Sequence, residues 1–263
     1  MKNKILFAVA VLLVLVAGLA AYLFRSSGQP EPVSAAIAPL PVPPAESPAL
    51  ESPPPRPVSQ LPLPPLTKSD GFVLEKLAGL AGNQALVKLV YSERIIHNIV
   101  VTVDNLPQQR VPAKVMPLRP PQGGFLVFDS GGSLTMSPDN AHRYAPYVSL
   151  AKAIDSGKLV ELYVRLYPLF QQSYAELGYP GRNFNDQLIE TLDDLLAAPA
   201  VVEPVRLSQP RYFYQFADPA WEALSIGQKI MLRLGSENEK VVKNKLREIK
   251  QELALHPNEL AAD

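Results

Sequence analysis

Tyrosines recur along one stretch of the sequence and are the side chains best suited to bind a ligand. Tyr163, Tyr167, Tyr174 and Tyr179 follow one another, with Phe170 between them. A tyrosine combines an apolar ring with a polar hydroxyl, so such a series can line a groove for a peptide or a glycan strand. Such a series more often builds an ordinary hydrophobic core, and the sequence leaves both interpretations open.

Amide and carboxylate side chains lie close to these tyrosines in the sequence, where they would orient a ligand if a pocket forms. The residues that we expect at this site are Tyr163, Tyr167, Gln171, Tyr174, Tyr179, Asn185 and Asp186. An enzyme that cleaves a polymer here would need an acid, such as Asp186 or Glu190, held in a cleft with a perturbed pKa.

The chain carries none of the short motifs that mark common catalytic or metal sites: no His-Glu-x-x-His, no phosphate-binding glycine loop, no Gly-x-Ser-x-Gly elbow and no calcium loop. Asp139 and His142 have the spacing of two metal ligands on one helical face, but Asp139 can instead join Ser137 in capping a helix. Asp193 and Asp194 could suggest paired carboxylates, but adjacent helical residues point in different directions, so we expect them to lie on a solvated helix face. We expect no catalytic set, no metal and no cofactor.

The composition excludes several classes of protein. The 25 basic and 25 acidic residues balance, which argues against a general nucleic-acid binder. The chain has no cysteine, so disulfides, cysteine-ligated zinc and a thiol nucleophile are excluded.

An uncharged run of 20 residues, 5–24, predicts a single transmembrane helix. At about 1.5 Å per residue such a helix spans roughly 30 Å, the thickness of the hydrocarbon core. Lys2 and Lys4 precede it and only Arg25 follows closely, which places the N-terminus in the cytoplasm and the rest of the chain in the periplasm. The alternative is a cleaved secretory signal with a weak cleavage pattern at 18–20.

Residues 25–66 predict a proline-rich, disordered linker. Of the 28 prolines in the chain, 14 fall between Pro30 and Pro65, and they remove backbone donors and favour extended structure. The proline-rich runs 53–57 and 61–66 could dock into an aromatic groove on a partner, although such runs more often serve as solvated spacers. The linker would let the following domain work away from the membrane.

From Thr67 onward the sequence predicts a globular domain that is mainly helical. Apolar periodicity and end signals predict helices over 70–80, 83–106, 138–155, 158–177, 184–197, 219–235 and 237–253. Ser156 and Asp218 are expected N-caps, and Pro168 is expected to kink its helix. Two small hairpins are expected, 125–129 with 133–136 and 202–207 with 212–216.

The last expected helix carries an apolar stripe with charged residues on its other side. The stripe is formed by Val242, Leu246, Ile249 and Leu253. It predicts an amphipathic helix that packs on its own domain, with a coiled-coil seam as the alternative. The whole chain is thus expected to contain a cytoplasmic N-terminus (1–4), an anchor (5–24), a linker (25–66), a compact multi-helix domain with one or two β-hairpins (67–255) and a frayed tail (256–263).

A series of short runs resembles a family of Gram-negative bacterial proteins known as domain of unknown function 3014. The runs are 99–107, 143–148, 166–171, 176–180, 184–186, 216–219, 227–229 and 233–235. Two positions depart from the family pattern: Gln187 stands where an arginine is expected, and Trp221 where an aliphatic residue is more common. The resemblance implies an envelope protein anchored in the inner membrane, and it brings no activity, cofactor or catalytic residue.

The layout of anchor, spacer and domain, together with the absence of catalytic motifs, favours a non-enzymatic role. We expect a membrane-tethered periplasmic module that binds an envelope protein or a cell-wall component such as peptidoglycan. The alternative is a periplasmic hydrolase, or another enzyme, that acts on cell-envelope polymer.

Overall fold

The computed structural model describes residues 62–81, 89–109, 121, 123–210 and 213–260. The expected cytoplasmic N-terminus, the expected anchor at 5–24 and the expected linker as far as residue 61 lie outside this part of the chain. Among the residues described, no helix combines the length and the apolar character needed to cross a bilayer.

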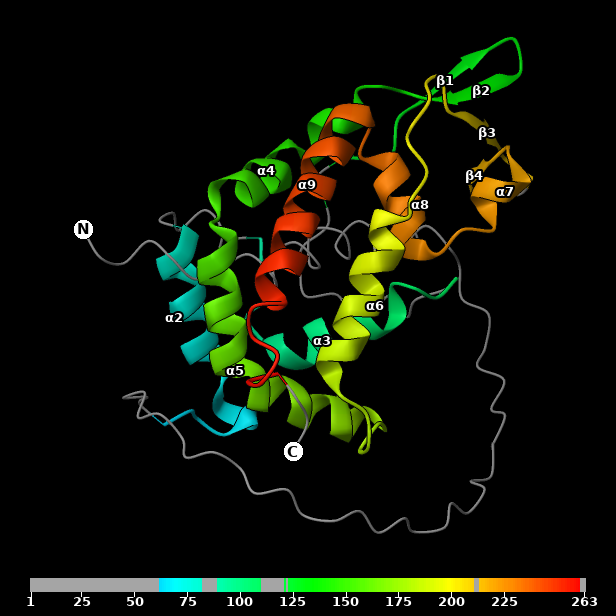
Figure 1. The fold of residues 1–263 in the computed structure, drawn as a ribbon. Helices are drawn as coiled ribbons and strands as arrows, with labels where there is room; N and C mark the ends of the chain where they lie inside the picture. The colour runs from blue at the N-terminus through cyan, green and yellow to red at the C-terminus, as the bar shows by residue number, and fades with distance from the viewer. Residues whose placement is uncertain (1–61, 82–88, 110–120, 122, 211–212, 261–263) are drawn as a thin grey trace, which may run out of the picture.

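These residues form a mainly helical domain, as expected, and their strands form one small antiparallel sheet (Figure 1). The helical elements are a 3₁₀ turn η1 (Leu66–Lys68) and the helices α2 (Asp70–Ala81), α3 (Ile95–Asn105), α4 (Asn140–Ala153), α5 (Ser156–Leu177), α6 (Phe184–Leu196), α7 (Pro219–Glu222), α8 (Ile226–Arg233) and α9 (Ser236–Leu253).

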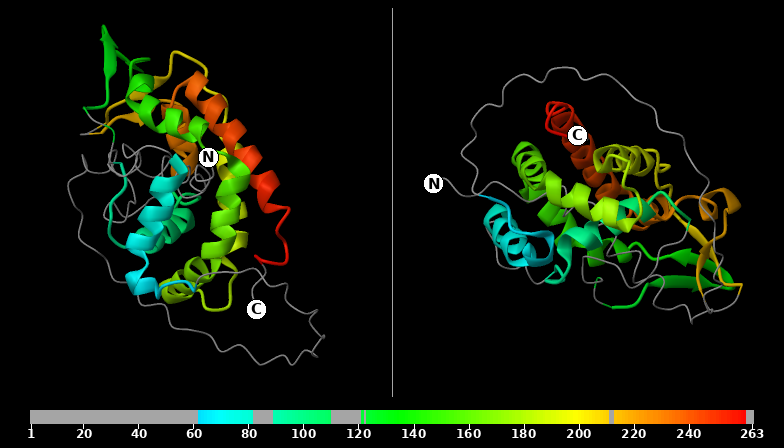
Figure 2. Two further views of the ribbon diagram at one scale, coloured as in Figure 1. Left: turned by 90° about the vertical axis from the view of Figure 1, so that its left-hand side faces the viewer. Right: turned by 90° about the horizontal axis from the view of Figure 1, so that it is seen from below.

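Helix α9 lies along one face of the helical body (Figure 2). It packs against α4, α5 and α6, while α3 packs against α5 and α6 from the other side. The stripe of Val242, Leu246, Ile249 and Leu253 is buried in the main core. The prediction that this helix packs on its own domain is therefore confirmed, and the coiled-coil alternative is wrong.

The sheet contains four strands in sequence order: β1 (Val127–Ser130), β2 (Ser133–Met136), β3 (Arg206–Ser208) and β4 (Gln215–Phe216). Strands β1 and β2 form the expected first hairpin, whose two-residue turn uses Gly131 and Gly132 at φ values of 62° and 88°. The second expected hairpin forms with shorter strands. The pairing of β2 with β3 was not expected, and it joins both hairpins into one sheet.

Two hydrophobic cores result from this arrangement. The main core lies among the helices. The second core lies between the inner face of the sheet and α8; its buried residues are Met136, Val201, Val205, Leu207, Phe216 and Leu232. Both figures place the sheet at one side of the helical body (Figures 1 and 2).

Helix α5 has a different N-cap from the predicted one, but it extends to Leu177 and contains Pro168 as predicted. The N-cap is Asp155, whose side chain accepts a hydrogen bond from the backbone N–H of Lys158 at 3.0 Å, and Ser156 is already helical. Asp155 takes this role because a carboxylate matches the unpaired N–H groups of a first turn. The helix continues through the exposed Pro168 and changes direction partway along (Figure 1). A missing backbone donor at Pro168 accounts for the bend.

Helix α3 begins at Ile95, so the prediction of a helix running continuously from residue 83 is wrong over residues 89–94; residues 83–88 lie outside the described part. The cap of α3 comes from another helix. The Asp70 carboxylate of α2 accepts hydrogen bonds from the backbone N–H groups of Arg94 and Ile95, both at 2.8 Å. Arg94 itself has a left-handed backbone with φ 53°, which is incompatible with a continuous helix.

The predicted helix over 219–235 is two helices. Asp218 caps α7 as expected, by accepting from the N–H of Ala220 at 2.8 Å. Ser225 then caps a separate helix, α8, by accepting from the N–H of Gln228 at 3.0 Å. The second cap ends the first helix, because its extended backbone interrupts the helical hydrogen bonds.

Both ends of the predicted globular domain extend further than the sequence indicated. Leu63 and Leu66, at the end of the expected linker, pack against the main core, so this part of the run 61–66 is not a solvated spacer. Beyond α9, Leu260 is only 2% exposed and belongs to the main core, so the expected frayed tail is packed up to this residue.

Candidate functional site

The structure brings the expected tyrosines together as part of the main core. Tyr163, Tyr167 and Tyr174 are each at most 5% exposed, and Tyr179 is partly buried. The ring centroids of Tyr163 and Phe170 lie 5.4 Å apart, and those of Tyr174 and Tyr179 lie 4.7 Å apart in a stacked pair. Such contacts are those of an interior aromatic cluster.

The amide side chains near these rings are engaged with the tyrosine hydroxyls and with the start of α6. The Tyr167 hydroxyl lies 2.7 Å from Asn183 Oδ1 and 3.1 Å from Gln171 Oε1. Asn183 caps α6, and its Nδ2 donates to the carbonyl of Leu260 at 2.8 Å. Gln171 accepts from the N–H of Phe184 at 2.8 Å. These bonds join α5, α6 and the C-terminal segment.

The remaining expected residues are more loosely placed. Asn185 Oδ1 lies 3.5 Å from the Tyr163 hydroxyl, while the carboxylate of Asp186 is exposed. Burial, followed by smaller effects that include the Asp186 charge, raises the pKa of Tyr167 to about 12, so this hydroxyl stays protonated at neutral pH. The seven expected residues therefore do cluster, but most of their polar atoms already hydrogen-bond within the protein. Their role in ligand binding stays a prediction.

Two half-buried acids, Asp104 and Asp194, lie on α3 and α6, which pack against each other. Burial raises the pKa of Asp104, which lies 3.5 Å from the Tyr179 hydroxyl, and the nearby hydroxyl partly offsets that effect. Burial likewise raises the pKa of Asp194, which accepts from the Ser225 hydroxyl at 2.6 Å. The solvated-face prediction fits the exposed Asp193, which pairs with Lys250, but it is wrong for Asp194.

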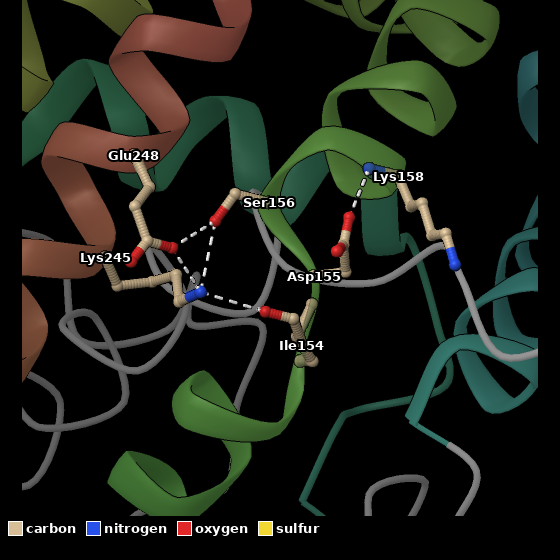
Figure 3. A network of polar contacts seen from close by, with 6 residues as sticks. All are labelled: Ile154, Asp155, Ser156, Lys158, Lys245 and Glu248. Carbon is tan, nitrogen blue, oxygen red and sulfur yellow. Dashed lines mark hydrogen bonds and ion pairs between the residues drawn. The ribbon is translucent and has the colours of Figure 1, made fainter.

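A polar junction that the sequence did not indicate joins α9 to the corner between α4 and α5 (Figure 3). The Ser156 hydroxyl donates to Glu248 Oε2 at 2.7 Å. The Lys245 ammonium donates to the same carboxylate at 2.5 Å, to the carbonyl of Ile154 at 2.9 Å and to Ser156 Oγ at 3.1 Å. The hydrogen bond from Lys245 is the main reason that the pKa of Glu248 is lowered.

This junction resembles a serine–lysine pair, but its charges do not suit nucleophilic catalysis. A lysine that activates a serine must be neutral in order to accept the proton. Here Lys245 donates hydrogen bonds to three oxygen acceptors, one of them a carboxylate. The arrangement therefore stabilises the packing of α9 on the α4–α5 corner.

The feature that differs most from the sequence expectation is Arg233, the last residue of α8. It is 7% exposed, and its guanidinium carbon lies 5.4 Å from the ring centroids of both Phe125 and Phe216. Burial lowers the pKa of Arg233 to about 10. A signal was available in the sequence: Arg233 falls seven residues after the buried Ile226 and three after the buried Ile230, on the apolar face of the helix.

Arg233 has no hydrogen-bond or ion-pair partner among the described residues, and its Nε is enclosed without one. The nearest acid in electrostatic terms, Glu222, is engaged elsewhere. Its Oε2 accepts from the N–H of Phe216 at 2.9 Å, and its Oε1 lies 3.4 Å from Lys229 Nζ. Glu222 therefore does not neutralise the guanidinium directly.

No metal centre is formed within the part of the chain that the structure describes, where no group of three His, Cys, Asp or Glu residues could hold an ion. Asp139 occupies the N-cap position of α4, but its side chain makes no capping bond; its N–H donates to Ser137 Oγ at 3.2 Å. The alternative that Asp139 joins Ser137 in capping α4 is therefore correct for the position of Asp139 and for the Ser137 hydroxyl, but not for the Asp139 side chain.

Comparison with known proteins identifies one relationship. The model of a family described as protein of unknown function (DUF3014) matches residues 95–250, a region that contains the tyrosine cluster, the Lys245 junction and Arg233. No curated protein and no solved structure matches the chain.

Proposed function

We propose a binding role in the cell envelope for this chain, which belongs to the family of proteins of unknown function DUF3014. In this proposal residues 5–24 anchor the chain in the inner membrane, and the proline-rich segment carries the domain into the periplasm. The domain then binds an envelope protein or a cell-wall component without chemical conversion.

One observation carries the preference for binding over catalysis: Ser156, which lies beside a lysine, hydrogen-bonds to both members of a structural Lys245–Glu248 salt bridge. Ser156 and Lys245 share the Glu248 carboxylate, and the lysine also supports the carbonyl at the end of α4. The acids weighed for a hydrolase, Asp186 and Glu190, are both exposed on α6. An exposed acid lacks the desolvated surroundings that usually tune a catalytic carboxylate.

Cell fractionation tests the location. The full chain, expressed with a C-terminal tag in Gram-negative cells, should sediment with inner membranes and resist extraction by carbonate at high pH. Protease should degrade the tag only after the outer membrane is opened. A soluble product that begins near residue 21 would contradict the anchor, and a tag that stays protected after opening would contradict the orientation.

Crosslinking tests the binding role. A crosslinker applied to intact cells should join the full chain to a specific envelope partner, identified by mass spectrometry after purification through the tag. Incubation of the purified full chain with cell-wall material provides the complementary test, because release of soluble fragments would favour the hydrolase instead. A matched Asp186→Asn chain would show whether such release depends on this acid.

A further inference from the structure

We propose that Arg233 binds a carboxylate carried on an apolar or aromatic group, such as the C-terminal carboxylate of a peptide that ends in an apolar residue. The site lies in the second core, where α8 meets the sheet. This inference names a ligand class for the binding role proposed above, and it depends on that role only for its use in the cell.

The first argument is the contrast between Arg233 and Glu239, the two charged residues that are buried among the described residues. Glu239, at 3% exposed, lies 2.7 Å from the ammonium of Lys243 and accepts from the N–H of Val201 at 3.0 Å. Arg233 is buried to a similar extent but, among the described residues, has no such partner. A buried charge that the protein does not pair is costly, and a ligand of opposite charge removes that cost.

The second argument is that the protein holds the guanidinium in place without using its donors. Phe125 and Phe216 flank it at equal distances of 5.4 Å. The segment before β1 is itself fixed, since Asn140 bonds both the N–H and the carbonyl of Leu126, at 3.0 Å and 2.7 Å. A cation held between two rings with its N–H groups unsatisfied is preorganised to accept an anion.

The third argument concerns access and ligand chemistry. Nε is enclosed, whereas the two terminal nitrogens, which carry four of the five donors, are not among the enclosed atoms. Two parallel N–H groups match the two oxygens of a carboxylate. The partly buried apolar residues around the second core, Tyr214, Trp221 and Leu224, favour a ligand with an apolar body. The nearby charge of Glu222 disfavours a doubly charged phosphate.

The single tryptophan of the chain provides the measurement. The Trp221 ring lies 5.9 Å from the Phe216 ring in an edge-to-face pair, and Phe216 contacts the Arg233 guanidinium. A ligand at Arg233 should therefore change the tryptophan fluorescence of the full chain, purified in detergent. Benzoate is the probe, because it joins a carboxylate to a small aromatic ring.

Three further probes separate the features of the ligand. Benzamide keeps the ring and the shape of benzoate but lacks the negative charge, acetate lacks the apolar body, and inorganic phosphate tests a different oxyanion. We expect a saturable fluorescence change with benzoate, affinity about tenfold weaker or less for acetate and phosphate, and no saturable change with benzamide. Equal responses to benzoate and benzamide would overturn the proposal, because the charge would then play no part.

Variants assign the response to Arg233. Arg233→Met should abolish the response to benzoate, and Arg233→Lys, which keeps the charge but loses the forked geometry, should weaken binding by about tenfold. Arg206→Met is the matched control, since Arg206 is an exposed arginine on the strand next to β4 and should leave binding unchanged. If the methionine variant does not fold by circular dichroism, the lysine variant decides.

Two further results would overturn the proposal. One is benzoate binding to Arg233→Lys or Arg233→Met with the affinity of the original chain, and the other is the absence of a saturable benzoate response in the original chain. If the proposed cellular location is wrong, the fractionation experiment will show it, and the benzoate titration will be unaffected. The two proposals therefore fail separately.

Discussion

Replacement of Arg233 by methionine tests whether the buried charge of this side chain lowers the stability of the folded domain. Methionine keeps an unbranched apolar stem that can fill the space between Phe125 and Phe216, but it removes the charge. Burial lowers the pKa of Arg233 to about 10. A base whose pKa is lower in the folded than in the unfolded chain destabilises the folded state as long as the base is protonated. For Arg233 this destabilisation is present in full at every pH below about 10, and it decreases only as the pH rises above that value and the folded chain releases the proton.

The size of the effect follows from opposing contributions. The lowered pKa of Arg233, a side chain that is 7% exposed, corresponds to a cost of about 3 kcal/mol at neutral pH. The contacts with Phe125 and Phe216 lie at 5.4 Å, near the limit of about 6 Å for a cation–π interaction, so each offsets this by about 1 kcal/mol and not by the ~2 kcal/mol of a close desolvated pair. The net expectation is that Arg233→Met stabilises the domain by about 1 kcal/mol. For a domain of this size the melting temperature should rise by about 2–4 °C.

Thermal unfolding of the full chain at pH 7, followed by the fluorescence of Trp221, measures this change. Arg206→Met serves as the control, because removal of an exposed arginine should alter stability by less than about 0.5 kcal/mol. A melting temperature that falls in Arg233→Met but not in Arg206→Met would refute the reasoning. Arg233 would then be a structural support between the two rings, and its lack of a polar partner would carry no functional meaning.

Three further changes test the description of the fold. Gly227→Ala should destabilise the domain by about 1–3 kcal/mol in urea unfolding, because the new Cβ would lie 2.6 Å from the buried Leu195 side chain. Gly79→Ala is the control: its Cβ would have nothing within 4 Å, so this change should be neutral or stabilising. Tyr167→Phe should cost about 1 kcal/mol through its lost 2.7 Å hydrogen bond, and an unchanged urea midpoint would contradict that bond. The pKa of Asp194 is raised in the folded chain, so the folded chain binds more protons than the unfolded chain between the ordinary aspartate pKa and the raised pKa. The free energy of unfolding should therefore fall as the pH rises through this range. Asp194→Asn should remove this decrease, as measured by melting curves across the range.

The helices whose ends are set by neighbouring residues could be predicted from the sequence. In α6, Asn183 accepts from the N–H of Asn185 at 2.7 Å, two residues away, and in α9 the apolar stripe is complete within the helix itself. Periodicity and capping are local signals, and here they agree with the packing. The tight turn at Gly131 and Gly132 is local in the same sense.

The start of α3 could not be predicted, because its cap lies far away in the chain. Asp70 accepts from the N–H of Ile95, 25 residues later, at 2.8 Å. The apolar residues Val90 and Ile95 are both buried, so the hydrophobic pattern was correctly assigned to the core even though a break lies between them. Periodicity alone does not distinguish a continuous helix from a helix that follows a buried turn.

The tyrosine cluster illustrates a different limit. The sequence placed its tyrosines and amides correctly as neighbours, but it could not show that the amides would bond to Tyr167 and to the start of α6. Asn183 and Gln171 take part in these bonds, and Leu260, 77 residues after Asn183, supplies a further partner. Whether a polar group faces a ligand or another part of the protein depends on such long-range contacts.

Arg233 shows how a site can arise at the boundary between elements that are distant in the sequence. Phe125 precedes β1, Phe216 lies in β4, and the unexpected pairing of β2 with β3 places both strands in one sheet over α8. Since the acidic and basic residues of the chain balance at 25 each, no strong overall field draws an anion toward this sheet. Binding there would depend on short-range hydrogen bonds and apolar contact. Those interactions select a small apolar carboxylate and not a polyanion, in agreement with the charge balance that argues against nucleic acid.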